Sequence, residues 1–267
     1  MKKPKTIQEA IDIYHLDDFI NYEEKIANSN EKKLFHIFEY FNNLIKNEKY
    51  TIDKTGVKTV ELLGWQCRNL NPWQPLLDFG NNHKSAKNYI KQEIGWYLTQ
   101  DRSVKEIGEI AKIWKQVADK SGNINSNYGW CIWSAANTYQ FKYALEELIN
   151  NQDSRRATMI YTRPSIWEDF NKDGMSDYIC TWGTHAFIRN NKLYYIINQR
   201  SCDVWFGLRN DLAWHCYVYQ RLFNLLAEVS IELEKSYDGI IYNCDSIHAY
   251  ERHFDIITDI ADNFKHN

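Results

Sequence analysis

The sequence predicts an α+β protein, because segments with helical and with strand character occur along it without strict alternation. Three observations support this class. The first 50 residues contain two helix-like runs, residues 177–201 contain two strand-like segments separated by the turn Arg-Asn-Asn, and a long helix-like run after Asp211 precedes a strand and a closing helix. No internal repeat, low-complexity tract or linker divides the chain, so one large domain is expected.

The N-terminal 50 residues are expected to be helical. Thr6 and Glu9 have the spacing of a capping box at the start of the first run. In the second run, apolar residues recur on one helical face at Leu34, Ile37, Phe38, Phe41 and Leu44. A second capping box, Ser103 with Glu106, predicts a further helix that continues through residues 110–120.

The remaining segments can be assigned from periodicity and turn residues. Strands are expected at residues 57–65, 157–162, 177–188, 192–201 and 239–247, and helices at residues 85–98, 141–149, 212–235 and 251–264. A loop rich in Trp, Pro and Asn separates the first of these strands from the first of these helices.

Composition excludes several classes of protein. With 44% hydrophobic and 25% charged residues the chain is not disordered, and no apolar run approaches the ~18 residues that span a bilayer, so no membrane partner is expected. A net charge of −3 gives no general attraction for nucleic acid, so direct DNA binding is not expected. The start, MKKPKTIQEA, lacks the apolar core of a secretory signal, which favours the cytoplasm.

The six cysteines have neither paired nor zinc-ligand spacing, so reduced thiols and no metal site are expected. Four segments concentrate donors that suit a phosphate: residues 53–56, residues 153–156, residues 199–201, and the pair His248 and Tyr250. Each signal alone also fits a plain turn or a solvated surface pair.

Cys180 and Asp211 each allow two interpretations. Cys180, expected near the middle of a strand, is either a buried apolar cysteine or a nucleophile activated by a nearby cation, which Arg200 on the neighbouring strand could supply. Asp211 precedes a long apolar helical run, so it is either a helix cap at Leu212 or a functional carboxyl group.

Taken together, these segments resemble a known family. DKTG, the helix with Glu93 and Trp96, IWKQVAD, NYGW, DSRR, Cys180, QRSCDVWFGL and HAY occur in the order seen in thymidylate synthases. The longer strings DKTGVKT, INSNYGW, DSRRATMIYTRPS, FNKDGMSDYICT and DVWFGLRNDLAW are similar to the deoxycytidylate 5-hydroxymethylases that T-even-type phages contribute to this family.

The resemblance runs from about Thr51 to His253. It implies a catalytic domain over residues 51–267, preceded by a helical extension over residues 1–50. It also implies a mixed α/β sandwich that forms a homodimer through its sheet, with arginines shared across the interface, and a host-cytoplasmic location if the chain is phage-encoded.

The resemblance also implies a role for each matching residue. Cys180 would add to carbon 6 of a pyrimidine nucleoside monophosphate, and Tyr128 would lie near the proton lost from carbon 5. The phosphate would be held by Lys54, Arg200 and Ser201, with Arg155 and Arg156 of the other subunit, and the deoxyribose by His248 and Tyr250. The cofactor 5,10-methylenetetrahydrofolate would contact Asp203 and Trp114, while Glu93 would organise catalytic water.

Asp211 replaces an asparagine of the synthases, and this exchange favours cytosine over uracil. Cytosine offers an acceptor at nitrogen 3 and a donor amine at carbon 4, which a protonated carboxyl group matches. Addition at carbon 6 pushes electron density toward nitrogen 3, so the same proton would stabilise the developing charge. The expected reaction is therefore 5-hydroxymethylation of dCMP.

The sequence also departs from the synthases. Ile179-Cys180-Thr181 stands where they have Pro-Cys-His, and DSIHAY replaces their sugar-binding motif. They end in an apolar tail that seals the folate site, whereas this sequence ends soon after its last expected helix, so a less tightly sealed site is expected. The alternatives are a hydroxymethylase acting on CMP or dUMP, a thymidylate synthase acting on dUMP, and a non-enzymatic nucleotide- or RNA-binding component of a phage nucleotide-synthesis complex.

Overall fold

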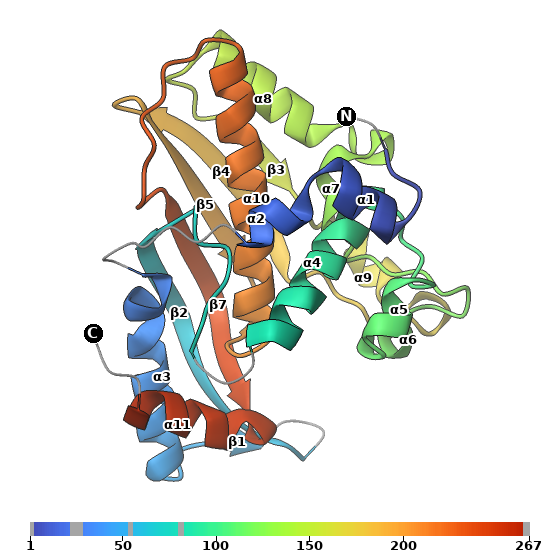
Figure 1. The fold of residues 1–267 in the computed structure, drawn as a ribbon. Helices are drawn as coiled ribbons and strands as arrows, with labels where there is room; N and C mark the ends of the chain where they lie inside the picture. Colours follow the sequence, from blue (N-terminus) through green and yellow to red (C-terminus); the bar gives the residue numbers. More distant parts are fainter. Residues whose placement is uncertain (1–2, 22–28, 53–55, 80–82, 264–267) are drawn as a thin grey trace.

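The computed structural model describes residues 3–21, 29–52, 56–79 and 83–263. One sheet dominates this part of the chain, with the strand order β1-β2-β7-β5-β4-β3 and with β6 paired to β7 (Figure 1). The strands are β1 (Thr51–Ile52), β2 (Lys58–Leu70), β3 (Thr158–Ile160), β4 (Thr181–Arg189), β5 (Lys192–Gln199), β6 (Cys202–Asp203) and β7 (Ile240–Tyr250). Mixed strands and helices of this kind confirm the α+β class.

Helices precede, interrupt and follow the strands. They are α1 (Ile7–Ile13), α2 (Leu16–Asn21), α3 (Asn30–Lys46), α4 (His83–Thr99), α5 (Ile107–Ile110), α6 (Ile113–Val117), α7 (Tyr128–Trp133), α8 (Gln140–Asn150), α9 (Ile166–Asp169), α10 (Gly207–Glu228) and α11 (Phe254–Asn263), with short 3-10 turns at Ala135–Asn137, Lys172–Gly174 and Glu251–His253. In the described residues, no helix combines the length and the apolar character needed to cross a lipid bilayer.

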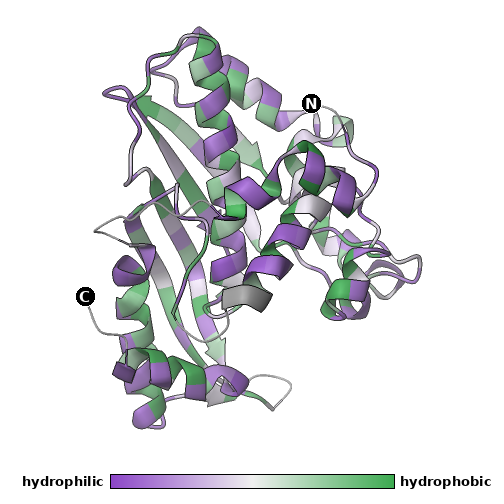
Figure 2. Cartoon of the chain, in the orientation of Figure 1, coloured by the Kyte–Doolittle hydropathy of each residue, from purple (hydrophilic) through white to green (hydrophobic). Residues whose placement is uncertain are grey.

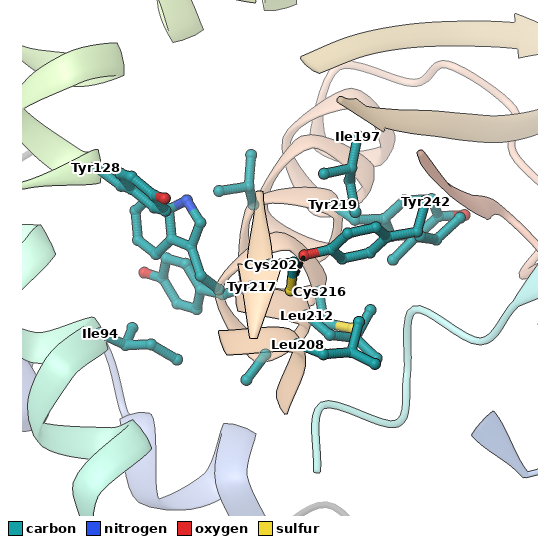
Figure 3. Close-up of a cluster of buried hydrophobic side chains, with 14 of the residues drawn as sticks. Ile94, Tyr128, Ile197, Cys202, Leu208, Leu212, Cys216, Tyr217, Tyr219 and Tyr242 are labelled. Carbon is teal, nitrogen blue, oxygen red and sulfur yellow. Dashed lines mark hydrogen bonds between the residues drawn. The ribbon is translucent and has the colours of Figure 1, made fainter. Parts of the chain in front are cut away.

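The long helix α10 crosses one face of the sheet and forms the centre of the core (Figure 1). Leu208, Leu212 and Cys216 on α10 are fully buried, and Figure 3 shows them beside the ring of Tyr242 from β7. In Figure 2, green hydrophobic residues run along the strands that α10 crosses, while α10 itself alternates between green and purple. Burial of this apolar face explains why the helix forms here.

Sheet pairing brings distant segments together at the centre of the sheet. β4 and β5 form an antiparallel hairpin whose turn contains Asn190 and Asn191, both with positive φ, as the Arg-Asn-Asn turn predicted. β5 and β7 pair in parallel, and α10 lies in the connection between them. The ends of β4, β5 and β7 consequently meet near the start of α10.

The N-terminal helices belong to the same core. Thr6 caps α1 by accepting a hydrogen bond from the backbone N–H of Glu9, as predicted. Ile7 and Ile11 of α1 lie against Gly95 of α4, where an added Cβ would come within 3.1 Å of Ile7 Cγ2. Helix α3 packs on β2 and α11. A boundary near residue 50 stays a prediction.

The predicted helix through residues 110–120 is wrong. Ser103 lies in an isolated β-bridge with Asn123, and Glu106 accepts a hydrogen bond from the backbone N–H of Ile7 at 2.8 Å instead of closing a capping box. Two short helices, α5 and α6, replace the continuous one. Tertiary contacts of both box residues therefore outweigh the local capping preference.

Candidate active site

Cys180 lies directly before β4, not in the middle of a strand as the sequence suggested. It is the one cysteine that is only partly buried, since the other five are buried. Its carbonyl oxygen accepts a hydrogen bond from the backbone N–H of Arg200 at 2.9 Å. This backbone link places the thiol beside the side chain of Arg200.

Two hydrogen bonds to backbone carbonyls hold the Arg200 guanidinium beside Cys180. Nε donates to the carbonyl of Ile179 at 3.0 Å, and Nη2 donates to the carbonyl of Tyr178 at 2.7 Å. The same Nη2 lies 3.7 Å from Cys180 Sγ. The thiol therefore lies beside a cation, although Arg200 directly follows β5 and is not part of the strand as expected. Activation of Cys180 as a nucleophile stays a prediction.

The electrostatics of Cys180 combine opposing influences. Burial raises the pKa of the thiol to about 12, the Arg200 cation lowers it, and the Asp211 carboxyl group raises it. Arg200 is exposed and remains accessible to an anionic ligand. In this arrangement, Arg200 favours the thiolate, and neutralising Asp211 would favour it further.

Asp211 lies inside α10, which begins at Gly207, so the helix-cap interpretation is wrong. Oδ1 of Asp203, not Asp211, accepts the backbone N–H groups of Trp205 and Phe206 before the helix, at 2.8 and 3.3 Å. Burial raises the pKa of Asp211 to about 7, and a hydrogen bond from Gln199 lowers it. At neutral pH this carboxyl group is therefore poised between its two protonation states.

Gln199 fixes the orientation of Asp211. Its Nε2 donates to Asp211 Oδ2 at 2.7 Å and to Thr181 Oγ1 at 3.0 Å. Its Oε1 accepts a hydrogen bond from the Tyr242 hydroxyl at 2.6 Å. Since both ends of the buried amide are used, the nitrogen is directed at Asp211.

Glu93 is a second buried carboxyl group in this region. It lies on α4 and accepts a hydrogen bond from the Tyr89 hydroxyl at 2.8 Å, and Tyr89 in turn accepts one from Trp114 Nε1 at 3.0 Å. Burial raises the pKa of Glu93 to about 8, the hydrogen bond from Tyr89 lowers it, and the Asp211 carboxyl group raises it. The pKa values of Glu93 and Asp211 thus both lie near neutral pH.

Tyr128 connects the Glu93 region to Cys180. Its hydroxyl oxygen accepts the backbone N–H of Thr181, the residue after Cys180, at 3.3 Å. Its ring stacks on Tyr97 of α4 at 5.1 Å between centroids. The following residue must be glycine, because a Cβ at Gly129 would lie 1.7 Å from the carbonyl oxygen of Tyr97. This close approach gives a physical reason for the Asn-Tyr-Gly-Trp motif.

Four of the residues predicted to bind the sugar and the phosphate lie where β5, β6 and β7 meet: Arg200, Ser201, His248 and Tyr250. Ser201 follows β5, and in β6 Asp203 pairs with His248 of β7. His248 and Tyr250 have their rings 5.0 Å apart, and both are partly buried. The predicted residue Lys54 lies outside the described residues.

The residues predicted to bind folate show suitable chemistry. Asp203 keeps Oδ2 near His253 Nδ1 and Arg252 Nη2, at 3.6 and 3.7 Å, and its side chain is 15% exposed. Trp114 presents a partly buried ring, packed on Trp96 at 5.0 Å between centroids. A carboxylate acceptor and an indole wall fit a flat pterin ring with N–H donors.

Arg155 and Arg156 are not brought to Cys180 within one chain. The carbonyl of Arg155 accepts a hydrogen bond from His185 of β4, and Arg156 pairs with Glu147 at 2.8 Å. Five or six strand residues separate this position from Cys180, roughly 15–20 Å at about 3.3 Å per residue. Contribution of either arginine to a neighbouring subunit stays a prediction.

Several residues of this network were not predicted from the sequence. Tyr89 precedes Glu93 by four residues on one helix, so helical spacing could have revealed it. No comparable sequence pattern points to Thr181 or Tyr242, because a strand bulge and parallel strand pairing bring them to Gln199. Among the described residues, no cluster of three metal-ligating side chains occurs.

Comparison with known proteins shows the family of the chain. The sequence model of the thymidylate synthase family matches residues 37–263. The chain is 44% identical to deoxycytidylate 5-hydroxymethyltransferase of Enterobacteria phage T4, and equally to that of phage T6, over 214 residues that cover 80% of this chain and 84% of each relative. It is 30% identical to a thymidylate synthase of Wigglesworthia glossinidia brevipalpis over 225 residues, 80% of this chain and 78% of that protein. The chain therefore belongs to the thymidylate synthase family.

Proposed function

We propose that the chain is a deoxycytidylate 5-hydroxymethyltransferase. It would convert dCMP, 5,10-methylenetetrahydrofolate and water into 5-hydroxymethyl-dCMP and tetrahydrofolate. The observation that carries this proposal is Asp211, a carboxyl group with a pKa of about 7 in the position where a base-binding asparagine is expected in synthases. The names of the phage relatives support the same substrate.

The hydrogen bonds of Asp211 suit cytosine. Oδ2 already accepts a hydrogen bond from Gln199, so the proton of the neutral acid belongs on Oδ1. An acid with this arrangement donates from Oδ1 to ring nitrogen 3 and offers the second lone pair of Oδ2 to the amine at carbon 4. Uracil presents the opposite pattern and would leave buried polar groups unpaired, at a cost of about 1 to 3 kcal/mol each.

Cys180 would act as the nucleophile toward carbon 6 of the base. A bond forms between Sγ and carbon 6, and the electron pair of the 5,6 double bond is displaced toward nitrogen 3, where the proton of Asp211 stabilises it. Arg200 lies 3.7 Å from Sγ and favours the thiolate. This addition makes carbon 5 nucleophilic.

When bound, methylenetetrahydrofolate supplies the one-carbon unit for carbon 5. Asp203 and Trp114 would hold it through an acceptor carboxylate and an aromatic wall. Tyr128, fixed by the Thr181 N–H, would lie near the proton that carbon 5 loses. Glu93 would orient the water that adds to the exocyclic methylene, which distinguishes hydroxymethylation from the hydride transfer of a synthase.

The nucleotide's other groups would be bound by the strand ends around Cys180. Arg200 and Ser201 would hold the phosphate together with Lys54, and His248 and Tyr250 would contact the deoxyribose. Arg200 is exposed, and the N–H donors of its guanidinium that are not used on the carbonyls of Tyr178 and Ile179 suit a phosphate.

A homodimer formed through the face of the sheet opposite α10 would complete this site. Side chains on that face stay outside the core: Phe187, Tyr194, Ile196 and Ile241 are partly exposed, and Ile160 is 59% exposed. Partly exposed apolar side chains on one face of a sheet are typical of a protein interface. A partner subunit on this face would supply Arg155 and Arg156, which are exposed beside β3 and β4.

The proposal is tested by incubating the protein with methylenetetrahydrofolate and dCMP, CMP or dUMP and identifying the products by mass. We expect a hydroxymethyl group on dCMP with tetrahydrofolate as the second product. Cys180→Ala should abolish the reaction. Formation of dTMP with dihydrofolate, or preference for CMP or dUMP, would contradict the assignment.

A further inference from the structure

Tyr89 links two residues to which the proposed function gives separate tasks. Its hydroxyl lies 2.8 Å from Glu93 Oε1 and 3.0 Å from Trp114 Nε1. Tyr89 and Glu93 are four residues apart on α4, so their side chains share one helical face, while Trp114 comes from α6. The hydroxyl thus bridges a carboxyl group and the indole that would line the folate site.

The direction of these two hydrogen bonds is fixed by chemistry. An indole N–H can only donate, so the Tyr89 oxygen must accept from Trp114. The single proton of the phenol is then free for Glu93, and Oε1 must accept it. A neutral Glu93 therefore carries its proton on Oε2. Tyr89 thus determines which carboxyl oxygen of Glu93 gains and loses the proton.

Several other groups also influence Glu93. The phenol of Tyr97 on the same helix lowers the pKa of Glu93, and the cation of Arg209 on α10 does so too, whereas the Asp211 carboxyl group raises it. Burial and the Glu93 charge hold the pKa of Tyr89 well above its usual range, so the phenol stays protonated and remains a donor. Of the groups that lower the pKa of Glu93, Tyr89 has the largest effect.

We propose that Tyr89 is a positioning residue that orients Glu93, favours its ionised form and connects it to Trp114. This inference rests on the proposed function only for what Glu93 does in the reaction. Hydrogen bonds in a chain strengthen one another, so the donor at Trp114 makes the Tyr89 hydroxyl a better donor to Glu93. A shift of the Trp114 indole when folate binds would then change the proton affinity of Glu93.

The test measures the ionisation of Glu93 directly, in the ligand-free protein. The carboxyl carbon of Glu93 is followed by NMR during a pH titration of ¹³C-glutamate-labelled protein, with the signal assigned by its loss in Glu93→Gln. In Tyr89→Phe the phenol donor is gone, so the midpoint should rise by about one pH unit, as expected for a lost hydrogen bond to a charged group. An unchanged midpoint would overturn the proposal.

A matched control is available in the core. Tyr161 accepts a hydrogen bond from Trp214 Nε1 at 3.3 Å, the same indole-to-phenol contact. Among the described residues, however, no carboxylate is one of the groups that act on the Tyr161 hydroxyl. Tyr161→Phe should therefore lose a comparable buried contact and leave the Glu93 midpoint where it is. A similar rise of the Glu93 midpoint in Tyr161→Phe would show that the effect of Tyr89→Phe reflects a general loosening of the core.

Trp114→Phe tests the hydrogen bond between Trp114 and Tyr89, and it remains informative if Tyr89→Phe fails to fold. It preserves the Tyr89 contact to Glu93 and removes only the indole donor, so a smaller rise of the Glu93 midpoint is expected. In the double variant, Trp114→Phe should add nothing to the effect of Tyr89→Phe. Equal and additive shifts would show that the two residues act independently and would overturn the connection.

The rate of hydroxymethylation supplies a separate readout. If Glu93 acts ionised, the acid limb of the kcat profile should move to higher pH in Tyr89→Phe by the amount seen in the titration. Failure of the wild type to form 5-hydroxymethyl-dCMP would reject the proposed function but leave the NMR result for Tyr89 intact. A normal wild-type reaction with an unmoved Glu93 midpoint would reject the Tyr89 proposal alone.

Discussion

Nε2 of Gln199 donates a 2.7 Å hydrogen bond to Oδ2 of Asp211, and this contact decides which oxygen of the carboxyl group carries a proton. The Tyr242 hydroxyl on Gln199 Oε1, at 2.6 Å, prevents the amide from turning round. The two side chains come from β5 and α10, so sheet and helix together orient the group expected to read the base.

Replacing Gln199 by Leu should weaken dCMP turnover. The change removes the donor to Asp211 and leaves the Tyr242 hydroxyl and Thr181 Oγ1 without their shared partner. We expect kcat/KM for dCMP to fall about 10- to 100-fold, from the usual cost of unpaired buried groups. An unchanged kcat/KM in this variant would show that Gln199 does not orient Asp211 for the reaction.

Asp211→Asn should change the preferred base. An amide can donate to oxygen 4 of uracil and accept from its nitrogen 3, so dUMP should gain and dCMP should lose, together shifting the ratio of kcat/KM by at least about 100-fold. Competition between the two nucleotides, followed by mass spectrometry, measures this ratio. An unchanged ratio would remove Asp211 from base recognition.

The same substitution should make stability less dependent on pH. The pKa of Asp211 is raised from 3.8 to about 7 in the folded chain, so the folded state binds the proton more tightly than the unfolded state. The stability associated with this proton is fully present below about pH 4 and is lost as the pH rises through 7. Asp211→Asn should therefore raise Tm relative to wild type by more at pH 8 than at pH 5. A constant difference in thermal melts would contradict the raised pKa.

Cys180 should be alkylated slowly at neutral pH and increasingly fast in base. With a pKa of about 12, its thiolate fraction rises nearly tenfold per pH unit across the accessible range, and the rate of iodoacetamide labelling should follow it. Arg200→Gln should slow labelling further because the nearby cation is lost. The five buried cysteines should contribute little, and a Cys180→Ser sample measures that background. Saturation of the rate below pH 8 would show a much lower pKa.

Arg155 should act on the site of the neighbouring subunit. Cys180→Ser and Arg155→Ala should each be inactive as homodimers, but exchange of subunits creates heterodimers with one intact site. Since half of the dimers are then mixed, activity should recover to about a quarter of the wild-type value. Mixing Cys180→Ser with Cys180→Ala is the control without complementation. Absence of recovery despite proven exchange would place Arg155 outside a shared site.

Local sequence features predicted much of the architecture correctly. The Thr6 cap, the apolar face of α3 and the Asn190–Asn191 turn depend on contacts within a few residues, which a sequence displays directly. The Ser103 capping box failed for the opposite reason, since Glu106 binds the backbone of Ile7, far away in the sequence.

Periodicity and the order of motifs along the chain were enough to predict the class of the fold and the family, and they made Arg200 a candidate partner of Cys180. The pKa values of the two buried carboxyl groups, in contrast, depend on the folded structure. Burial raises the pKa of Asp211 to about 7 against the lowering effect of the hydrogen bond from Gln199. Burial likewise raises the pKa of Glu93 to about 8, with Asp211 adding to the rise and Tyr89 opposing it. Burial and hydrogen bonding across elements set these affinities, and neither can be seen in the order of residues along a chain.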